Sequence, residues 1–339
     1  MASPAPPSAS HRRRSLPPSP AASSVGSSPA FPPQKRHRSG RPPPLLGLVC
    51  DDGFYPALDH HPSYKPAVAV ARKADFEFHF VPDVPDRSWG WLPLDTRDGR
   101  VLLRSKFSEL DDDIDDDVVP NPRFHNYAVC DPLFKRYVLL PSIPDNLTAN
   151  EEGSLVDFGH CLAASHEDEE DTSFRVICVA RYTTKLVAFV FSSVTRQWRI
   201  AASSSWSALG AEEPPNRYGL DCFDCVDGCF YWTVPWVDKI LVLDGLKMEF
   251  SIINYAHRVE DGLRACVAVD REGKPGMLTV GEYMGNGKFR LSRIAKQSDS
   301  ESPNERLSEN IIELPSYYNE YFTLGAAEGF IFLRGIPGD

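Results

Sequence analysis

Three cysteines stand close together in the segment Cys222-Phe-Asp-Cys225-Val-Asp-Gly-Cys229. Closely spaced thiolates are ligands of structural zinc, which needs about four of them in a tetrahedral arrangement, usually as two separated pairs. No second pair stands at a usable spacing, and the segment leads directly into the apolar run Phe230-Tyr-Trp232. We interpret the three as core or turn cysteines, with a metal site as the alternative, and predict no metal and no cofactor.

Two acidic runs offer oxygen ligands of the kind that calcium binds. Asp111-Asp-Asp-Ile-Asp-Asp-Asp117 holds six carboxylates in seven residues, and His166-Glu-Asp-Glu-Glu-Asp171 follows further along the chain. The first run lacks the ligand spacing and the mid-loop glycine of an EF-hand. Because runs of like charge are ordinarily solvated, we interpret both as surface insertions, with binding of an ion or a basic partner as the alternative.

Catalytic motifs are sparse in this sequence. It contains no Gly-x-Ser-x-Gly nucleophile elbow, no His-Glu-x-x-His motif and no Walker loop. His60-His61 beside Asp59 could form an acid–base pair, but Pro62 follows at once, which is typical of a surface loop. We therefore predict that the protein is not an enzyme.

One glycine-rich segment, Gly281-Glu-Tyr-Met-Gly-Asn-Gly287, superficially resembles a phosphate-binding loop. Its Asn286-Gly287 pair is instead typical of a tight hairpin turn, because both residues tolerate a positive φ. The segment therefore predicts a hairpin that joins Met277–Tyr283 to Phe289–Ile294.

Tryptophans are candidates for anchoring a partner, because aromatic side chains are enriched at the energetic centres of protein interfaces. Three of the six lie in apolar runs and are predicted to be core residues. The other three lie in polar segments, which predicts exposure. We take them as candidate partner-binding residues: Trp89, Trp91 and Trp206.

Charge is distributed unevenly along the 339 residues. Residues 1–41 hold seven basic residues and no acid, which leaves 29 basic and all 47 acidic residues for the remainder. An acidic body repels phosphate backbones, so nucleic acid is not expected as its ligand. No run approaches the ~20 apolar residues that span a bilayer, which argues against a membrane protein.

The first 44 residues are rich in Ser, Pro, Ala and Arg, without hydrophobic periodicity. They cannot bury enough apolar surface to offset chain entropy, so residues 1–44 are predicted to be a disordered tail and residues 45–339 the folded domain. Arg12-Arg-Arg14 and Lys35-Arg-His-Arg38 could serve as nuclear localisation patches, and the acid-free composition also fits an organelle transit peptide. With no secretory signal and reduced cysteines, we expect a cytoplasmic or nuclear protein.

Beyond Leu45, short β-branched and aromatic runs alternate with turn residues, which predicts an all-β fold. Three runs form a repeat: Tyr127-Ala-Val-Cys-Asp131, Ala188-Phe-Val-Phe-Ser192 and Ile240-Leu-Val-Leu-Asp244. Each ends in a short polar residue that can cap a turn, and six residues later an aromatic opens another apolar run. Each unit therefore predicts a β-hairpin.

A second element recurs, in which glycine precedes an apolar strand: Asp98-Gly-Arg-Val-Leu-Leu103, Asp227-Gly-Cys-Phe-Tyr-Trp232 and Glu328-Gly-Phe-Ile-Phe-Leu333. Glycine supplies the positive φ that such a turn needs. The repeat spacings of 61 and 52 residues fit four-stranded propeller blades with loop insertions. We predict a β-propeller of about six four-stranded blades. The last blade is expected to be incomplete, because no capped hairpin follows Leu333.

These repeats resemble the β-propeller region of plant F-box proteins, the F-box-associated type of grasses. The resemblance rests on Pro43-Pro-Leu-Leu-Gly47, Tyr127-Ala-Val-Cys-Asp-Pro132 with Tyr137-Val-Leu-Leu-Pro141, and Asp227-Gly-Cys-Phe-Tyr-Trp232, and it covers residues 42–335. It implies a propeller that recognises substrates for a ubiquitin ligase. The leucine-rich F-box that binds the Skp1 adaptor has no counterpart here, because Leu16 is the only leucine among the first 44 residues.

Three functions therefore remain open. We favour a non-catalytic protein-interaction module whose partner is a protein that the sequence does not identify. The first alternative is a subunit of an SCF-type ubiquitin ligase that acts through another F-box protein. The second is a propeller enzyme, which would need carboxylates converging from several blades on the central channel.

Overall fold

A computed structural model of the chain describes residues 46–337, except for 51–52, 57–61, 84–87, 108–125, 149–152, 165–172, 213–220, 227, 235–238, 255–263, 270–274, 283–288, 295–310 and 328–329. The predicted tail (residues 1–44), both acidic runs and the His60-His61 pair lie outside the described residues. No helix in the described part of the chain is long and apolar enough to cross a membrane.

Four antiparallel sheets of four strands follow one another along the chain, and strands adjacent in sequence are adjacent in space. The strands are β3 (Ser88–Arg97), β4 (Arg100–Phe107), β5 (Tyr127–Asp131) and β6 (Arg136–Leu140); β7 (Leu155–Ala164), β8 (Phe174–Tyr182), β9 (Lys185–Ser192) and β10 (Gln197–Ser205); β11 (Asp221–Val226), β12 (Cys229–Val234), β13 (Lys239–Asp244) and β14 (Glu249–Asn254); β15 (Arg264–Val269), β16 (Pro275–Glu282), β17 (Phe289–Ile294) and β18 (Ile311–Glu313).

Two sheets of two strands stand at the ends of the described chain: β1 (Gly47–Cys50) with β2 (Gly53–Pro56), and β19 (Tyr318–Ala327) with β20 (Phe330–Pro337). The helices of the described residues are α1 (Tyr64–Lys73) and α2 (Asp145–Thr148). The all-β prediction is confirmed. The described residues do not form six four-stranded blades; they form four such sheets and two of half that size.

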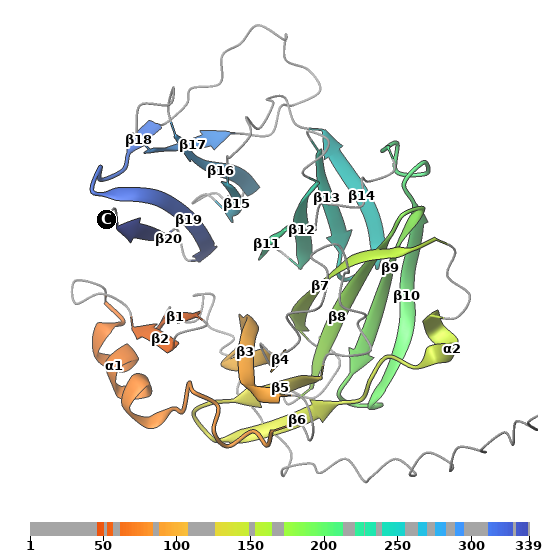
Figure 1. Cartoon of the computed structure of the whole chain (residues 1–339), viewed down its shortest axis with the longest axis horizontal. Helices are drawn as coiled ribbons and strands as arrows, with labels where there is room; N and C mark the ends of the chain where they lie inside the picture. Colours follow the sequence, from red (N-terminus) through yellow and green to blue (C-terminus); the bar gives the residue numbers. More distant parts are fainter. Residues whose placement is uncertain are drawn as a thin grey trace, which may run out of the picture.

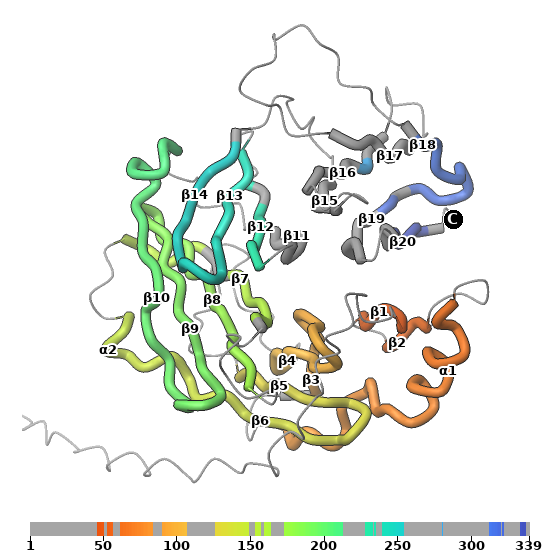
Figure 2. Tube along the Cα trace, turned by 180° about the vertical axis from the view of Figure 1, so that it is seen from behind, coloured from red at the N-terminus to blue at the C-terminus, as the bar shows by residue number. Residues whose placement is uncertain are grey.

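Figure 1 shows the sheets in chain order around a common centre, with a break between the first and the last. The first strands of the sheets meet one another on the inside: β3 contacts β7, and β15 contacts both β11 and β19. The same arrangement, seen from behind in Figure 2, keeps the two two-stranded sheets on either side of the break.

Apolar layers between neighbouring sheets hold this arrangement together. Val176 on β8 packs with Leu102 and Val129 of the β3–β6 sheet. Ile177, the next residue, packs on the other side with residues of β12 and β13, including Trp232. Because alternate side chains point to opposite faces, a strand buried on both faces contains a continuous apolar run, as β8 does at residues 176–180.

The three predicted hairpins are confirmed. β5 pairs with β6, β9 with β10 and β13 with β14, all antiparallel. In each pair the aromatic residue lies opposite the residue that precedes the polar end of the third strand: Tyr137 opposite Cys130, Trp198 opposite Phe191, and Phe250 opposite Leu243. β16 and β17 also pair as the Asn286-Gly287 turn predicted, although the turn itself is outside the described residues.

Candidate protein-interaction face

The tryptophans that the sequence assigned to a partner are not on the surface where the structure describes them. Trp91 is 5% exposed and packs in the cluster that includes Phe78 and Val101, because the polar segment around it is strand β3. Trp206 is fully buried, and its indole N–H donates to the backbone oxygen of Tyr182 at 3.1 Å. The prediction of exposure is therefore wrong for these two. Trp89 lies on β3, but its side chain is outside the described part.

The most exposed large apolar side chains of the three repeat hairpins are instead at their turns, residues 132–135, 193–196 and 245–248. We call these three turns the turn face. Each turn joins the third and fourth strands of its sheet. Since the three sheets have the same meander topology and follow one another around the ring, the turns occupy equivalent positions in consecutive sheets.

A polar side chain fixes the first turn and the third turn in the same way. The carboxylate of Asp131 accepts hydrogen bonds from the N–H groups of Leu133 and Phe134, both at 3.1 Å. The carboxylate of Asp244 accepts from the N–H groups of Leu246 and Lys247, both at 2.9 Å. These are the bonds expected of an Asp that caps its own turn.

The middle turn uses a hydroxyl for the same purpose, because Ser192 Oγ accepts from the N–H of Val194 at 3.3 Å. In all three turns the last residue has a positive φ, at Lys135 (52°), Arg196 (56°) and Met248 (56°). Residues other than glycine seldom adopt this backbone conformation without a structural reason. The three turns are therefore built on one plan, and each holds its tip in a defined position.

Each tip presents an apolar side chain followed by a basic one. Phe134, Val194 and Leu246 are 55%, 62% and 68% exposed. Within two residues of them stand the exposed basic residues Lys135, Arg196 and Lys247. A single exposed apolar residue needs no explanation, but a neighbouring apolar and basic residue recur in the turns of three consecutive sheets, which forms a pattern.

The two capping carboxylates differ in burial and therefore in acidity. Asp131 is buried, and the loss of solvation raises its pKa despite the hydrogen bonds from Phe134 and Leu133. Asp244 is more open to solvent, and the hydrogen bond from the Lys247 N–H lowers its pKa. The same sequence motif thus gives opposite shifts because the surroundings differ.

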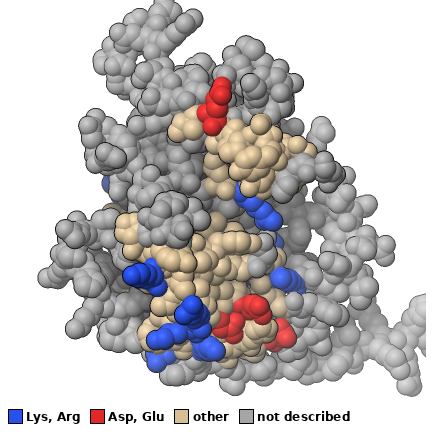
Figure 3. Space-filling model, turned by 90° about the vertical axis from the view of Figure 1, so that its left-hand side faces the viewer, with Lys and Arg blue, Asp and Glu red and all other residues tan. Residues whose placement is uncertain are grey.

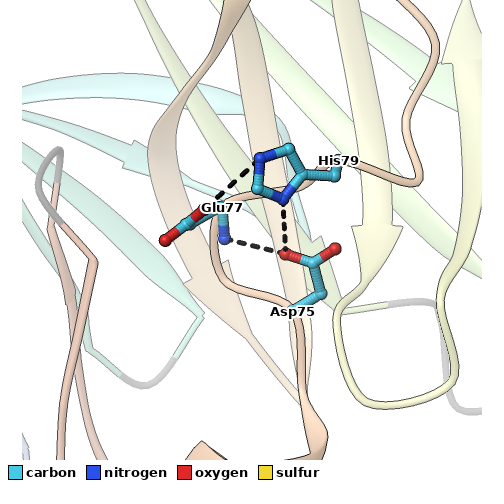
Figure 4. A network of polar contacts seen from close by, with 3 residues as sticks. All are labelled: Asp75, Glu77 and His79. Carbon is cyan, nitrogen blue, oxygen red and sulfur yellow. Dashed lines mark hydrogen bonds and ion pairs between the residues drawn. The ribbon is translucent and has the colours of Figure 1, made fainter.

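The segment that follows α1 is hydrogen-bonded to the first turn. The N–H of Asp75 donates to the backbone oxygen of Pro132 at 3.1 Å. As Figure 4 shows, the Asp75 carboxylate also accepts from the N–H of Glu77 at 3.1 Å and lies 3.6 Å from His79 Nδ1. Glu77 Oε2 lies 3.3 Å from His79 Nε2. His79 and Glu77 are largely exposed, so this network forms a polar surface on the segment that is hydrogen-bonded to the first turn.

The inner strands carry a pattern that the sequence analysis missed. In four of them a β-bulge leads directly into an acidic residue, a regularity that the strand pairing reveals: Asp95 on β3, Asp157 on β7, Asp224 on β11 and Glu320 on β19. Asp95 accepts a hydrogen bond of 2.7 Å from the N–H of Leu162 on β7, and burial raises its pKa. Asp95 thus ties two neighbouring sheets together.

Three of the five cysteines whose side chains are described lie in the core as small apolar residues do. Cys130, Cys161 and Cys178 are buried, and burial raises the pKa of the Cys130 thiol well above its ordinary value. Cys225 and Cys222 lie on β11, opposite Phe230 and Trp232. Across the residues that the structure describes, no three His, Cys, Asp or Glu side chains are placed to hold a metal ion.

Comparison with known proteins adds little to this geometry. No family model matches the sequence, and no curated protein matches it either. Among solved structures, the chain is similar to the β-propeller domain of Nup133 from Vanderwaltozyma polyspora, at 10% identity and a TM-score of 0.19. The match covers 76% of this chain and 56% of that one. At this TM-score the likeness supports no conclusion about fold or function.

Proposed function

We propose that this chain is a non-catalytic protein-interaction module of the β-propeller type, and that the turn face binds its partner. The observation that carries the proposal is the repeated pairing of an exposed apolar tip with a basic residue in three consecutive sheets. Turns held by side-chain caps lose little further conformational entropy on binding, which favours association.

Charge supports a partner with acidic residues around an apolar contact. Residues 42–339 carry a large excess of acidic side chains, yet the tips present Lys135, Arg196 and Lys247. Basic tips on an acidic body orient an incoming acidic surface toward the turn face, and such attraction weakens as salt rises. The expected partner is therefore a protein surface that combines acidic and aliphatic residues.

The resemblance to F-box-associated propellers suggests a finer version of this proposal. In that version the partner is a substrate protein, recognised as the propellers of F-box proteins recognise theirs. In the alternative, the chain is a subunit of an SCF-type ubiquitin ligase and binds to another F-box protein. The two differ in whether Skp1 and a cullin accompany the partner.

The test compares a turn-face variant with a matched surface variant in affinity capture from extract of the source organism. The first carries Phe134→Ser, Val194→Ser and Leu246→Ser. The control carries Ile200→Ser, which alters an exposed residue of β10 away from the turns. Proteins captured by wild type and control but lost with the turn-face variant support the proposal. Capture of an unchanged set by all three chains overturns it, and Skp1 with a cullin in the set favours the ligase alternative.

The other function left open by the sequence is a propeller enzyme. The acidic residues that follow the bulges of four inner strands are its candidate catalytic groups. Asp95 uses its carboxylate to tie two sheets together, which points to a structural role for the set. Asp157→Asn and Asp224→Asn separate the roles by thermal unfolding. Replacing a carboxylate that holds two sheets together lowers the melting temperature, whereas replacing a catalytic group commonly leaves stability unchanged or raises it.

A further inference from the structure

Three tyrosines lead from the surface into the core at the start of β19. Tyr317 is 68% exposed, and its ring centroid lies 4.4 Å from that of Tyr318. The Tyr318 ring meets Tyr321 edge to face at 5.3 Å, and Tyr321 is buried. The Tyr321 hydroxyl donates to the backbone oxygen of Pro315 at 2.6 Å, which holds the segment before β19 in place. We call these three residues the tyrosine ladder.

The surface beside the ladder is apolar. The Tyr318 ring lies directly over Gly335 of β20, where a side chain would collide with it. Ile336, the next residue, is 41% exposed. Figure 3 looks at this side of the molecule and shows that most of its described surface is uncharged. An exposed aromatic ring that a second ring supports is suited to bind proline, because aromatic-lined grooves are the sites that proline-rich segments occupy.

The sequence holds a segment of this chemistry. Arg14-Ser-Leu-Pro-Pro-Ser-Pro20, which lies outside the described residues, has Pro17 three positions after Arg14 and three before Pro20. We call residues 14–20 the proline segment. A polyproline II helix has three residues per turn, so this spacing predicts all three side chains on one edge. Pro-x-x-Pro segments bind aromatic grooves in that conformation, which they populate before binding, so little entropy is lost.

Charge favours this segment as the occupant of the ladder. Residues 1–41 hold seven basic residues and no acid, whereas the remainder carries 29 basic and 47 acidic residues. The exposed Glu313 and Arg334 flank the ladder in the sequence with opposite charges, so the attraction arises from the acidic body as a whole. Such a field raises the local concentration of a basic segment.

The connection to the folded part is long enough. The chain enters through β1, and the β1–β2 and β19–β20 sheets lie on either side of the break in Figures 1 and 2. The 25 residues from 21 to 45 join the proline segment to Leu46. A flexible linker of this length has an end-to-end distance of roughly 25–30 Å, and tethering of this kind gives an effective concentration of about a millimolar. Weak affinity is therefore enough for binding within one chain.

We propose that the proline segment binds the tyrosine ladder of the same chain in the polyproline II conformation. Its proline rings pack against Tyr317 and against the apolar surface that includes Ile336. The ladder is then an intramolecular peptide-binding site, and the basic N-terminal part of the chain is its ligand. This inference stands independently of the turn face.

The test is limited trypsin digestion of the full chain in dilute solution, followed by mass spectrometry. Two bonds are compared: Arg14–Ser15 within the proline segment and Arg38–Ser39 outside it. We expect Tyr317→Ala to speed cleavage of the first bond at least tenfold and to leave the second unchanged. The melting temperature should not change, because Tyr317 is largely exposed. Tyr64→Ala, at an exposed tyrosine of α1, is the matched control and should cut as wild type does.

A second pair of variants changes the ligand and leaves the folded part intact. Pro17→Ala with Pro20→Ala should release the Arg14–Ser15 bond as Tyr317→Ala does. Pro32→Ala with Pro33→Ala removes two prolines outside the segment and should have no effect. This pair decides the question even if Tyr317→Ala fails to fold.

Other results overturn the proposal. Equal cleavage of Arg14–Ser15 in wild type and Tyr317→Ala shows that the ladder does not hold the segment. Release by Pro17→Ala with Pro20→Ala alone places the segment elsewhere on the molecule. Protection that disappears on dilution assigns the ladder to the segment of a second copy. Equal release by both proline pairs excludes residues 14–20 as the specific ligand.

Discussion

Asp95 on β3 accepts a 2.7 Å hydrogen bond from the backbone N–H of Leu162 on β7, across 67 residues of sequence. The bond joins the inner strands of two sheets that share no strand pairing. Because sheets in such a ring are otherwise held by apolar packing, a directional bond of this kind fixes one inner strand relative to the next.

The first prediction concerns this bond. Asp95→Ala leaves the Leu162 N–H without its acceptor and should lower the free energy of unfolding by about 1–3 kcal/mol. Asp95→Asn keeps an acceptor oxygen and should cost less. Urea unfolding measures both, and equal losses in the two variants would show that the hydrogen bond is not the reason.

The pH dependence of this site follows from burial. Burial raises the folded-state pKa of Asp95 above its ordinary 3.8, so its favourable contribution is complete below that value and is lost as pH rises through the raised pKa. The advantage of wild type over Asp95→Asn should therefore decrease from pH 4 to pH 7. An advantage that grows over this range would contradict the assignment.

The third prediction compares the two turn caps. Asp244 has a lowered pKa, so its contribution is present above 3.8 and is lost as pH falls through the lowered value. Asp131 has a raised pKa, so its contribution is present at low pH and is lost as pH rises. Relative to Asp244→Asn, wild type should lose stability on acidification; relative to Asp131→Asn, it should gain. Thermal unfolding from pH 3 to pH 7 gives both slopes, and slopes of the same sign would contradict the prediction.

The fourth prediction concerns the contact between β7 and β12. A Cβ at Gly159 would stand 2.8 Å from Nε1 of Trp232, which is fully buried. Gly159→Ala should therefore cost about 1–3 kcal/mol through overpacking. Combined with Trp232→Phe, which shortens the ring system, the cost should be less than additive in a double-mutant cycle. Additive losses would mean that the two residues do not meet.

The fifth prediction separates Trp206 from partner binding. Its indole N–H donates to Tyr182 in a fully buried site, so Trp206→Phe should destabilise the protein by about 1–3 kcal/mol. The same variant should capture partners as well as wild type does at temperatures where it is folded. Loss of capture without loss of stability would contradict this prediction and show that Trp206 takes part in partner binding.

Local signals in the sequence determined the strands and the hairpins. Asp131 and Asp244 cap turns within three residues, and Tyr137 and Phe250 begin the returning strands. These interactions involve neighbours in the chain, so the spacing of residue types is enough to predict them. The class of the fold follows from the same alternation of strand and turn residues.

Tertiary structure decided which side chains are buried and how many strands each sheet contains. Trp91 and Trp206 stand in polar segments, yet residues distant in sequence cover them, and sequence patterns carry no record of such neighbours. The described residues form four four-stranded sheets and two two-stranded ones in place of the expected six blades, because the spacing of the repeats does not say which strands pair. The partnership of Asp95 with Leu162 depends on the arrangement of whole sheets, which is set by packing between them.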